Sequence, residues 1–282
     1  MDEALGLTEK LESRLLLSSV ARTGGTLRVF GDVGVNNVIT VGLDAAKKNV
    51  VVTVNGVTQS VSRNDLHAVR IFGDSGNDVI TIDSSQATFD IQTSIFGGAG
   101  DDRLRGGNER DYIEGNDGND RISLGNGRNF GFGGAGSDII DGGDQRDFIS
   151  GGAQPDLIHG GADRDQLQGD NGDDTIFGGS GDDTEDDGSD LIFGGRGNDS
   201  IEGEGSKDVI FGQDGNDTIN GGNDRDEIFG MAGDDVLTGG GDRDTIWGGN
   251  GNDTISGAGS GESHSGEYKF ITKFISEIVP RP

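Results

Sequence analysis

The chain of 282 residues has no cysteine, only 3 prolines and few aromatic residues. Without cysteine it forms neither disulfides nor thiolate metal sites. Apolar residues make up 30% of the chain, well below the roughly 45–50% of ordinary globular domains. The composition therefore excludes a broad conventional core, and any core that forms must be narrow.

Basic residues are also scarce, because 22 Lys and Arg face 51 Asp and Glu, for a net charge of −29. This charge repels the phosphates of nucleic acids and anionic membrane surfaces, so we expect no nucleic-acid partner. No apolar run approaches the roughly 18 residues of a membrane span, so we expect no membrane insertion. A chain this acidic folds compactly only if its carboxylates are neutralised, which favours a cation as ligand.

Residues 1–25 are expected to form an export or sorting segment. The apolar stretch Leu15–Val20 is too short for a standard signal-peptide core. Residues 11–18, LESRLLLS, resemble the LEPR-x-LL motif of bacterial surface and secreted proteins, with Ser13 where that motif has proline. A short exposed helix accounts for the same residues, and both interpretations stay open.

Glycine, by contrast, is abundant, with 55 residues, and it marks a repeat of nine residues that runs from Gly97 to Ser256. Of seventeen units, sixteen begin with glycine and sixteen have aspartate at position six; both exceptions, Leu124 and Asn129, lie in one unit. The unit 178–193 is seven residues longer than the others. We expect it to be one turn with an insertion at roughly Thr184–Asp190.

These units resemble the RTX nonapeptide GGxGxDxUx, in which U is a large apolar residue. The resemblance covers more than half of the chain and implies an all-β fold, a parallel β-roll (β-solenoid) of about nine coils. Glycines permit the positive φ angles of tight turns, and positions seven to nine form a short strand. Since side chains alternate along a strand, position eight points inward. The predicted core is Leu104, Ile113, Ile122, Ile140, Ile149, Ile158, Leu167, Ile176, Ile192, Ile201, Ile210, Ile219, Ile228, Leu237, Ile246 and Ile255.

Alternate turns fall on two edges of such a roll. The first edge comprises the turns that begin at residues 97, 115, 133, 151, 169, 194, 212, 230 and 248, and nearly all of them have glycine at position four. The second edge comprises the turns that begin at 106, 124, 142, 160, 178, 203, 221 and 239. Its position five is basic in seven of eight turns: Arg110, Arg128, Arg146, Arg164, Lys207, Arg225 and Arg243.

The resemblance implies that calcium lies between neighbouring turns of the first edge, held by hard oxygen ligands. Nine stacked turns enclose about eight such ions. The implied carboxylate ligands are Asp102, Asp120, Asp138, Asp156, Asp174, Asp199, Asp217, Asp235 and Asp253. The implied glycine positions of these sites are Gly98, Gly100, Gly118, Gly134, Gly136, Gly172, Gly195, Gly197, Gly215, Gly233, Gly249 and Gly251.

For the second edge, our hypothesis is that the basic side chains supply positive charge in place of calcium. They would pair with acids on neighbouring coils or with the position-six carboxylates of their own edge: Asp111, Asp147, Asp165, Asp226 and Asp244. Such exposed pairs are individually weak. In the competing interpretation both edges bind calcium and the basic side chains point to water; a count of bound ions separates the two.

Residues 26–96 are expected to be a smaller β-rich region that caps the roll. Strands are predicted at 27–30, 38–41, 50–54, 57–61, 69–72 and 79–82, and Asn55-Gly56 predicts a hairpin between two of them. The degenerate repeat that begins at Gly73 allows Asp78 to add one more calcium site. Residues 257–282 are expected to be a linker followed by an amphipathic segment, either a cap of the solenoid or a secretion signal.

No catalytic constellation is found in the sequence. Only three histidines exist, His67, His159 and His264, and there is no H-E-x-x-H motif. Gly73-Asp74-Ser75-Gly76 resembles a protease nucleophile loop, but it lies in register with the repeat. We therefore expect a protein without enzymatic activity.

The expected function is that of a secreted or cell-surface module that folds on calcium and has a structural or adhesive role. Cell-surface glycans or proteins are its expected partners, and extracellular calcium at about 10⁻⁴–10⁻³ M would be sufficient for such a module. The alternative is an export and folding module of a secreted enzyme or toxin whose active part lies in residues 1–96 or elsewhere. An aromatic stripe, Phe193, Phe211, Phe229 and Trp247, is expected to stack between coils.

Overall fold

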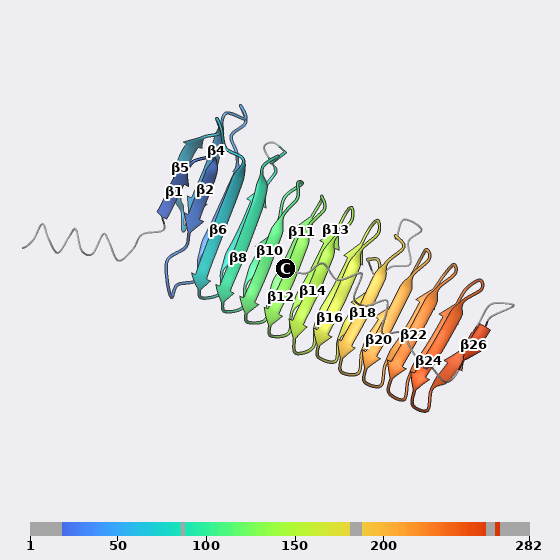
Figure 1. The fold of residues 1–282 in the computed structure, drawn as a ribbon. Helices are drawn as coiled ribbons and strands as arrows, with labels where there is room; N and C mark the ends of the chain where they lie inside the picture. Colours follow the sequence, from blue (N-terminus) through green and yellow to red (C-terminus); the bar gives the residue numbers. More distant parts are fainter. Residues whose placement is uncertain (1–18, 86–87, 181–187, 258–262, 266–282) are drawn as a thin grey trace, which may run out of the picture.

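The computed structural model describes residues 19–85, 88–180, 188–257 and 263–265. These residues form two sheets of thirteen strands each, which face one another along the whole solenoid (Figure 1). The all-β parallel roll expected from the repeat is therefore confirmed. In the described part of the chain no helix is long and apolar enough to cross a membrane.

Sheet A contains, in spatial order, β1 (Ser19–Thr23), β2 (Thr26–Phe30), β6 (Ala68–Ser75), β8 (Gln92–Ala99), β10 (Tyr112–Asp117), β12 (Phe130–Ala135), β14 (Phe148–Ala153), β16 (Gln166–Asn171), β18 (Leu191–Arg196), β20 (Val209–Asp214), β22 (Glu227–Ala232), β24 (Thr245–Asn250) and β26 (Ser263–Ser265). Sheet B contains β25 (Thr254–Ser256), β23 (Val236–Gly240), β21 (Thr218–Gly222), β19 (Ser200–Glu202), β17 (Thr175–Phe177), β15 (Leu157–Gly161), β13 (Ile139–Gly143), β11 (Arg121–Gly125), β9 (Arg103–Arg105), β7 (Val79–Asp83), β3 (Val38–Leu43), β4 (Asn49–Val54) and β5 (Val57–Ser62).

Neighbouring strands of the roll are parallel and in register with the repeat. Tyr112 of β10 pairs with Phe130 of β12, eighteen residues later, and this offset recurs along both sheets. The longer unit does not change the register, because Gln166 of β16 pairs with Leu191 of β18. Residues 178–193 are therefore one turn with an insertion, so that the basic turns stay on one edge.

The core is the predicted column of position-eight side chains. From Leu104 to Ile246 all of them are buried, and Ile255, at the end, is partly buried. The exceptional unit shows a compensation: Gly131 occupies position eight, and Leu124, from position one, is buried in its place. A Cβ on Gly131 would lie 2.9 Å from Leu124 Cδ2, so Leu124 fills the space that isoleucine fills elsewhere.

The N-terminal region continues both sheets. The six predicted strands are present as β2 to β7, and Asn55 (φ 49°) and Gly56 (φ 82°) form the predicted hairpin turn between β4 and β5. However, β6 and β7 pair directly with β8 and β9 of the roll, and the turn from Gly73 to Asp78 lies on the first edge. At this end of the described chain, the antiparallel pairs are the hairpin β1–β2 and the three-stranded meander β3–β4–β5.

At both ends, strands lie in segments that the sequence assigned to other roles. β1 lies within residues 1–25, and β26 lies within residues 257–282, where it extends sheet A beside β24. The LESRLLLS segment at 11–18 and the amphipathic residues 266–282 lie outside the described residues. Their expected roles remain predictions.

The aromatic stripe lies on sheet A and stacks between coils. The ring centroids of Phe193 and Phe211 are 5.2 Å apart, those of Phe211 and Phe229 are 4.7 Å apart, and those of Phe229 and Trp247 are 4.3 Å apart. The interplanar angles of 9–13° show parallel stacking. The prediction of stacking is confirmed.

Candidate metal-binding edges

First-edge turns lead from a strand of sheet A to the next strand of sheet B, and each places its position-six aspartate inside. Asp120, for example, is buried, and its Oδ1 accepts the backbone N–H of Asp102 from the preceding coil at 2.7 Å. The same bond links Asp120 N–H to Asp138. These bonds form a continuous row through Asn37, Asp78, Asp102, Asp120, Asp138, Asp156, Asp174, Asp199, Asp217, Asp235 and Asp253.

The second oxygen of most of these carboxylates has no hydrogen-bond partner within the described residues. A buried oxygen without a partner costs free energy, and an ionised one costs more. A Cβ built on Gly97 would lie 2.8 Å from the carbonyl oxygen of Gly115 and closer still to Asp102 Oδ2. Each first-position glycine therefore leaves a carboxylate oxygen and a carbonyl oxygen beside the same small space. The unpartnered oxygens are Oδ2 of Asp78, Asp102, Asp120, Asp138, Asp156, Asp174, Asp199, Asp217 and Asp235.

The predicted glycines occupy positions two and four of the first-edge turns. Gly118, at position four, has φ +132°, and any Cβ there would overlap the carbonyl of Gly100 in the preceding coil. Only glycine adopts such a φ without strain. All twelve predicted glycines have positive φ: Gly98, Gly100, Gly118, Gly134, Gly136, Gly172, Gly195, Gly197, Gly215, Gly233, Gly249 and Gly251.

Burial raises the pKa of the first-edge carboxyls. Desolvation raises the pKa of Asp120 to about 7, even though the N–H of Asp102 lowers it, and nearby aspartates raise it further. For the same main reason the pKa of Asp156 is about 8 and that of Asp102 about 6. A carboxylate row that resists ionisation needs either protons or bound cations at neutral pH.

The oxygen-only chemistry of this edge fits calcium. Among the described residues no three His, Cys, Asp or Glu side chains gather at one point. Each turn instead brings one carboxylate, beside main-chain carbonyls of its own and the neighbouring coil. Calcium takes six to eight oxygen ligands and accepts such a mixed set, whereas zinc prefers His and Cys. The residues that would hold the ions are the position-six aspartates and the turn carbonyls.

The turn that contains Asp156 differs from its neighbours. Gln154 replaces glycine at position four with φ 74°, and its Oε1 accepts the N–H of Gly136 at 2.6 Å. Asp156 itself keeps its place in the row, because its Oδ1 accepts the N–H of Asp138. The substitution therefore changes the outer part of this turn and leaves the buried carboxylate in place.

The second edge has an equivalent row of buried side chains, although its aspartates were predicted to pair with arginines. Here Asn129 takes the place of aspartate, accepting the N–H of Asp111 and donating its own N–H to Asp147. The sequence signal for this second row was the aspartate at position six of nearly every unit. The row runs through Thr93, Asp111, Asn129, Asp147, Asp165, Asp190, Asp208, Asp226 and Asp244.

This row corrects the predicted position of the insertion. Asp190, which we placed within the insertion, is the position-six residue of its turn, because its Oδ1 accepts the N–H of Asp165 at 2.7 Å. The extra residues therefore precede Asp190. Asp183, the alternative position-six residue, lies outside the described part of the chain.

The predicted pairing of second-edge arginines with their own carboxylates is not present among the described residues. The carboxylates of Asp111, Asp147 and Asp165 are buried and accept backbone N–H bonds, whereas the arginines are exposed. Among the position-five residues, Lys207 contacts Glu227 at 3.3 Å. Arg110 instead places its Cζ 4.8 Å from the centre of the Phe130 ring. The turn geometry separates positions five and six too strongly for pairing.

The edges also differ in the side chains that cover them. On the first edge, position-five Asn and Asp side chains accept N–H bonds from the following coil, as Asp101 does from Asn119 at 2.9 Å. On the second edge, position four is often not glycine, and its φ stays near the left-handed region, 68° at Gln145 and 71° at Asp224. Both edges thus bury carboxylates, and their outer surfaces differ at position five, which is Asn, Asp or Ser in most first-edge turns and Arg or Lys in most second-edge turns.

Comparison with protein families agrees with this geometry. The model of the RTX calcium-binding nonapeptide repeat matches residues 69–81, 96–131, 125–158, 150–185, 186–219 and 220–255. A search of the curated proteins finds no match. The match at 69–81 contains the degenerate turn of Asp78, so the repeat extends into the N-terminal region.

Proposed function

Because the chain belongs to the family of RTX calcium-binding nonapeptide repeats, we propose that it is an extracellular module with a structural or adhesive role, whose fold depends on calcium. Calcium binding follows from the family. The row of buried first-edge oxygens without hydrogen-bond partners is the observation that supports dependence of the fold on calcium. Each such oxygen opposes folding until a proton or a cation satisfies it.

About eight calcium ions are proposed for the first edge, one between each pair of neighbouring turns. Ions at these positions would remove more than half of the formal charge of −29 and with it much of the repulsion within the roll. The turn of Asp78 has the same buried carboxylate and extends the series toward the N-terminus. The calcium-free chain is then expected to be largely unfolded.

The second edge is proposed to bind fewer ions. Its outer wall carries a guanidinium or ammonium group in most turns, and a fixed positive charge near a site disfavours a divalent cation. Protons compete with calcium for the carboxyls of this edge, because burial raises the pKa of Asp165 to about 9 and that of Asp147 to about 7.

An extracellular location suits this chemistry, because calcium outside cells reaches the range of about 10⁻⁴–10⁻³ M in which such modules work. A non-enzymatic role is proposed because the candidate catalytic residues are engaged in other contacts. His159 contacts Asp141 at 3.0 Å and stacks on Phe177. Ser75, in the loop that resembles a protease motif, accepts a backbone N–H from Gly34 at 2.9 Å.

Circular dichroism of the metal-stripped full chain, titrated with calcium, tests the proposal together with ion counting by equilibrium dialysis. We expect a transition to β structure with about eight bound ions, one per interval between neighbouring first-edge turns. About twice that number would mean that both edges bind calcium. A chain that is equally folded with and without calcium at neutral pH would overturn the proposed dependence.

A further inference from the structure

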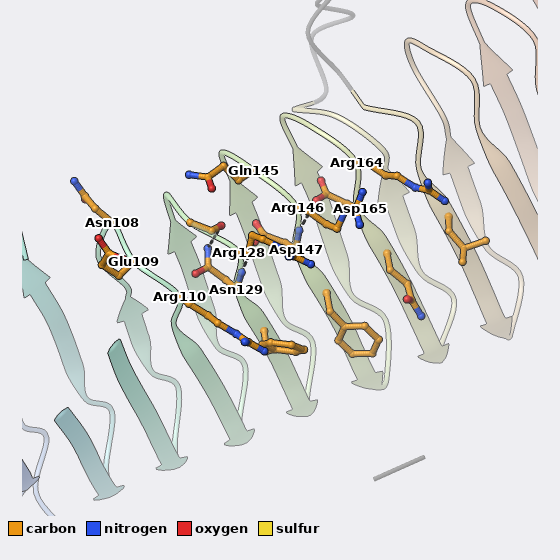
Figure 2. A pocket seen from close by; sticks show the side chains of 15 residues that line it. Asn108, Glu109, Arg110, Arg128, Asn129, Gln145, Arg146, Asp147, Arg164 and Asp165 are labelled. Carbon is orange, nitrogen blue, oxygen red and sulfur yellow. Dashed lines mark hydrogen bonds between the residues drawn. The ribbon is translucent and has the colours of Figure 1, made fainter. Parts of the chain in front are cut away.

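A groove on the second edge lies apart from the first-edge turns proposed to bind calcium. It has a volume of about 820 Å³ and lies over four successive turns, between those of Arg110 and Arg164 (Figure 2). Each turn contributes one arginine from position five, and all four side chains are exposed. The four are Arg110, Arg128, Arg146 and Arg164.

The solenoid sets the spacing of these arginines. Neighbouring coils are separated by the inter-strand distance of about 4.8 Å, so the four residues start from a straight row with that repeat. Figure 2 shows them following one another along the same edge. The Cζ of Arg110 lies 4.8 Å above the ring of Phe130, which helps to hold this arginine over the groove.

The guanidinium groups are available for a ligand. Among the described residues none of the four arginines forms an ion pair within 4.0 Å. The carboxylates of Asp147 and Asp165 also line the groove, but they point inward and burial raises their pKa. Glu109, Asp144 and Asp163 in the same turns are exposed, and they reduce the positive field without occupying the arginines.

The remaining lining residues combine amides and apolar rings. Asn108, Gln145 and Gln166 offer amide donors and acceptors, and Phe130 and Phe148 offer ring surface. A polymer of sugars presents hydroxyl groups to the first kind of residue and C–H faces to the second. The groove thus offers hydrogen-bonding and apolar contacts to a sugar polymer in addition to positive charge.

We propose that this groove binds a linear acidic polysaccharide, whose carboxylate or sulfate groups contact successive arginines. Guanidinium groups bind such planar or tetrahedral anions through paired hydrogen bonds, which lysine does not provide. A row with one cation per coil fits an extended chain that carries anions at regular intervals. This inference deepens the proposed adhesive role, on which it rests for the class of partner.

A sugar polymer fits better than a nucleic acid. Nucleic acids carry dense negative charge along their whole length, so their binding requires a broadly basic surface. The chain as a whole has a net charge of −29, and the groove supplies one arginine per coil over four coils. A short, moderately charged polymer therefore gains the local contacts with less repulsion from the rest of the roll.

Isothermal titration calorimetry on the calcium-loaded full chain tests the proposal. Because uronates bind calcium, free calcium is set equal in both solutions and verified with a calcium electrode. The probes are an oligogalacturonate hexamer and a heparin hexasaccharide, which separate carboxylate from sulfate as the recognised anion. The fully methyl-esterified galacturonate hexamer keeps the sugars and removes the charge. A single-stranded oligothymidylate of similar length tests nucleic acid.

The informative variant is Arg128→Gln with Arg146→Gln, at the centre of the groove. Its matched control is Arg103→Gln with Arg121→Gln, two exposed arginines paired across β9 and β11 on the outer face of sheet B. Both variants change the net charge equally. We expect the groove variant to weaken binding of an acidic hexamer by at least about tenfold, and the control by less than about twofold.

Several outcomes would overturn the inference. These are equal loss in both variants, binding of the methyl ester as tight as that of the acid, tighter binding of oligothymidylate, or no binding of either acidic hexamer. Circular dichroism in calcium verifies that each variant is folded. A chain that folds on calcium but does not bind acidic sugars contradicts this inference and leaves the proposed function intact. A chain that does not respond to calcium contradicts the proposed function itself.

Discussion

The two edges of the roll differ in their backbone at position four and in their side chains at position five, although both bury the same row of position-six carboxylates. First-edge glycines have φ from +125° at Gly100 to +155° at Gly172, whereas Gln145 and Asp224 on the second edge have 68° and 71°. The first edge is covered by Asn and Asp side chains, and the second by arginines. The buried carboxylates are common to both edges, so the proposed preference of calcium for the first edge depends on the side chains and backbone of the outer part of the turn.

Acidification provides the strongest test of this comparison. Burial raises the pKa of Asp120 and Asp217 to about 7 and that of Asp165 to about 9. The folded chain therefore binds more protons than the unfolded chain above the ordinary carboxyl pKa, so stability without calcium falls as pH rises. This contribution is complete below about pH 4 and lost as pH rises through about 6 to 9.

We expect the metal-stripped chain to gain β structure on acidification from pH 8 to pH 5, as measured by circular dichroism in calcium-free buffer. With saturating calcium the change should be much smaller, because the ions replace the protons on the first edge. A calcium-free chain whose β content is constant between pH 5 and pH 8 would show that the buried carboxyls are satisfied in another way.

Leu124 allows a test at the second-edge turn that lacks both the first glycine and the position-six aspartate. Replacing Leu124 by glycine restores the common first residue but empties the core beside Gly131, so we expect a loss of about 2–5 kcal/mol in the free energy of unfolding. The double variant Leu124→Gly with Gly131→Ile places the apolar group at position eight instead. Thermal unfolding in calcium should show recovery of most of the loss, and no recovery would mean that the two positions do not share one space.

Position four distinguishes the backbones of the two edges. Gly197 has φ +133°, and a Cβ would overlap the carbonyl of Gly172, so Gly197→Ala should cost about 1–3 kcal/mol or more. Asp224, at the same position of the second edge, has φ 71° and already carries a Cβ. Asp224→Ala is the matched control and should cost less; denaturant unfolding in calcium measures both. Equal losses in stability would show that the backbone at position four does not distinguish the two edges.

Neutralising one carboxylate on each edge gives the smallest expected effect and the sharpest contrast. Asp138→Asn keeps an oxygen that accepts the N–H of Asp120 but removes the charge, so we expect one or two fewer bound calcium ions. Asp147→Asn makes the same change on the second edge, where Asn129 already occurs naturally in the row. Equilibrium dialysis should show an unchanged ion count for this variant, and a decrease there would assign calcium to both edges.

Much of the fold was predictable because the repeat couples sequence to geometry. The nine-residue period fixed which side chains face inward, and the column from Leu104 to Ile246 is buried as predicted. The Asn55-Gly56 turn was equally local, since its positive φ angles depend on those two residues. Patterns that act within one turn or one strand are therefore well determined by sequence.

The failures concern features that depend on how different positions of the repeat are placed relative to one another. Leu124 enters the core only because Gly131, seven residues later, leaves space for it. The insertion was placed one residue too far along the chain, although Asp190-Leu191-Ile192 keeps the Asp-x-Ile spacing of the repeat. The hydrogen bond from Asp165 N–H to Asp190 shows the register. The arginine pairing failed because alternation within a turn, rather than charge, decides that Asp147 points inward and Arg146 outward.

The row of aspartate bonds gives the solenoid a polarity. Each Oδ1 accepts an N–H from the coil that precedes it in sequence, as Asp138 does from Asp120. A roll cut on its N-terminal side therefore exposes a carboxylate oxygen, which water solvates easily, whereas a cut on its C-terminal side exposes an N–H that has lost its acceptor. Growth of the stack is consequently not equivalent at its two faces: a coil added at the C-terminal face brings the acceptor, and a coil added at the N-terminal face brings the donor.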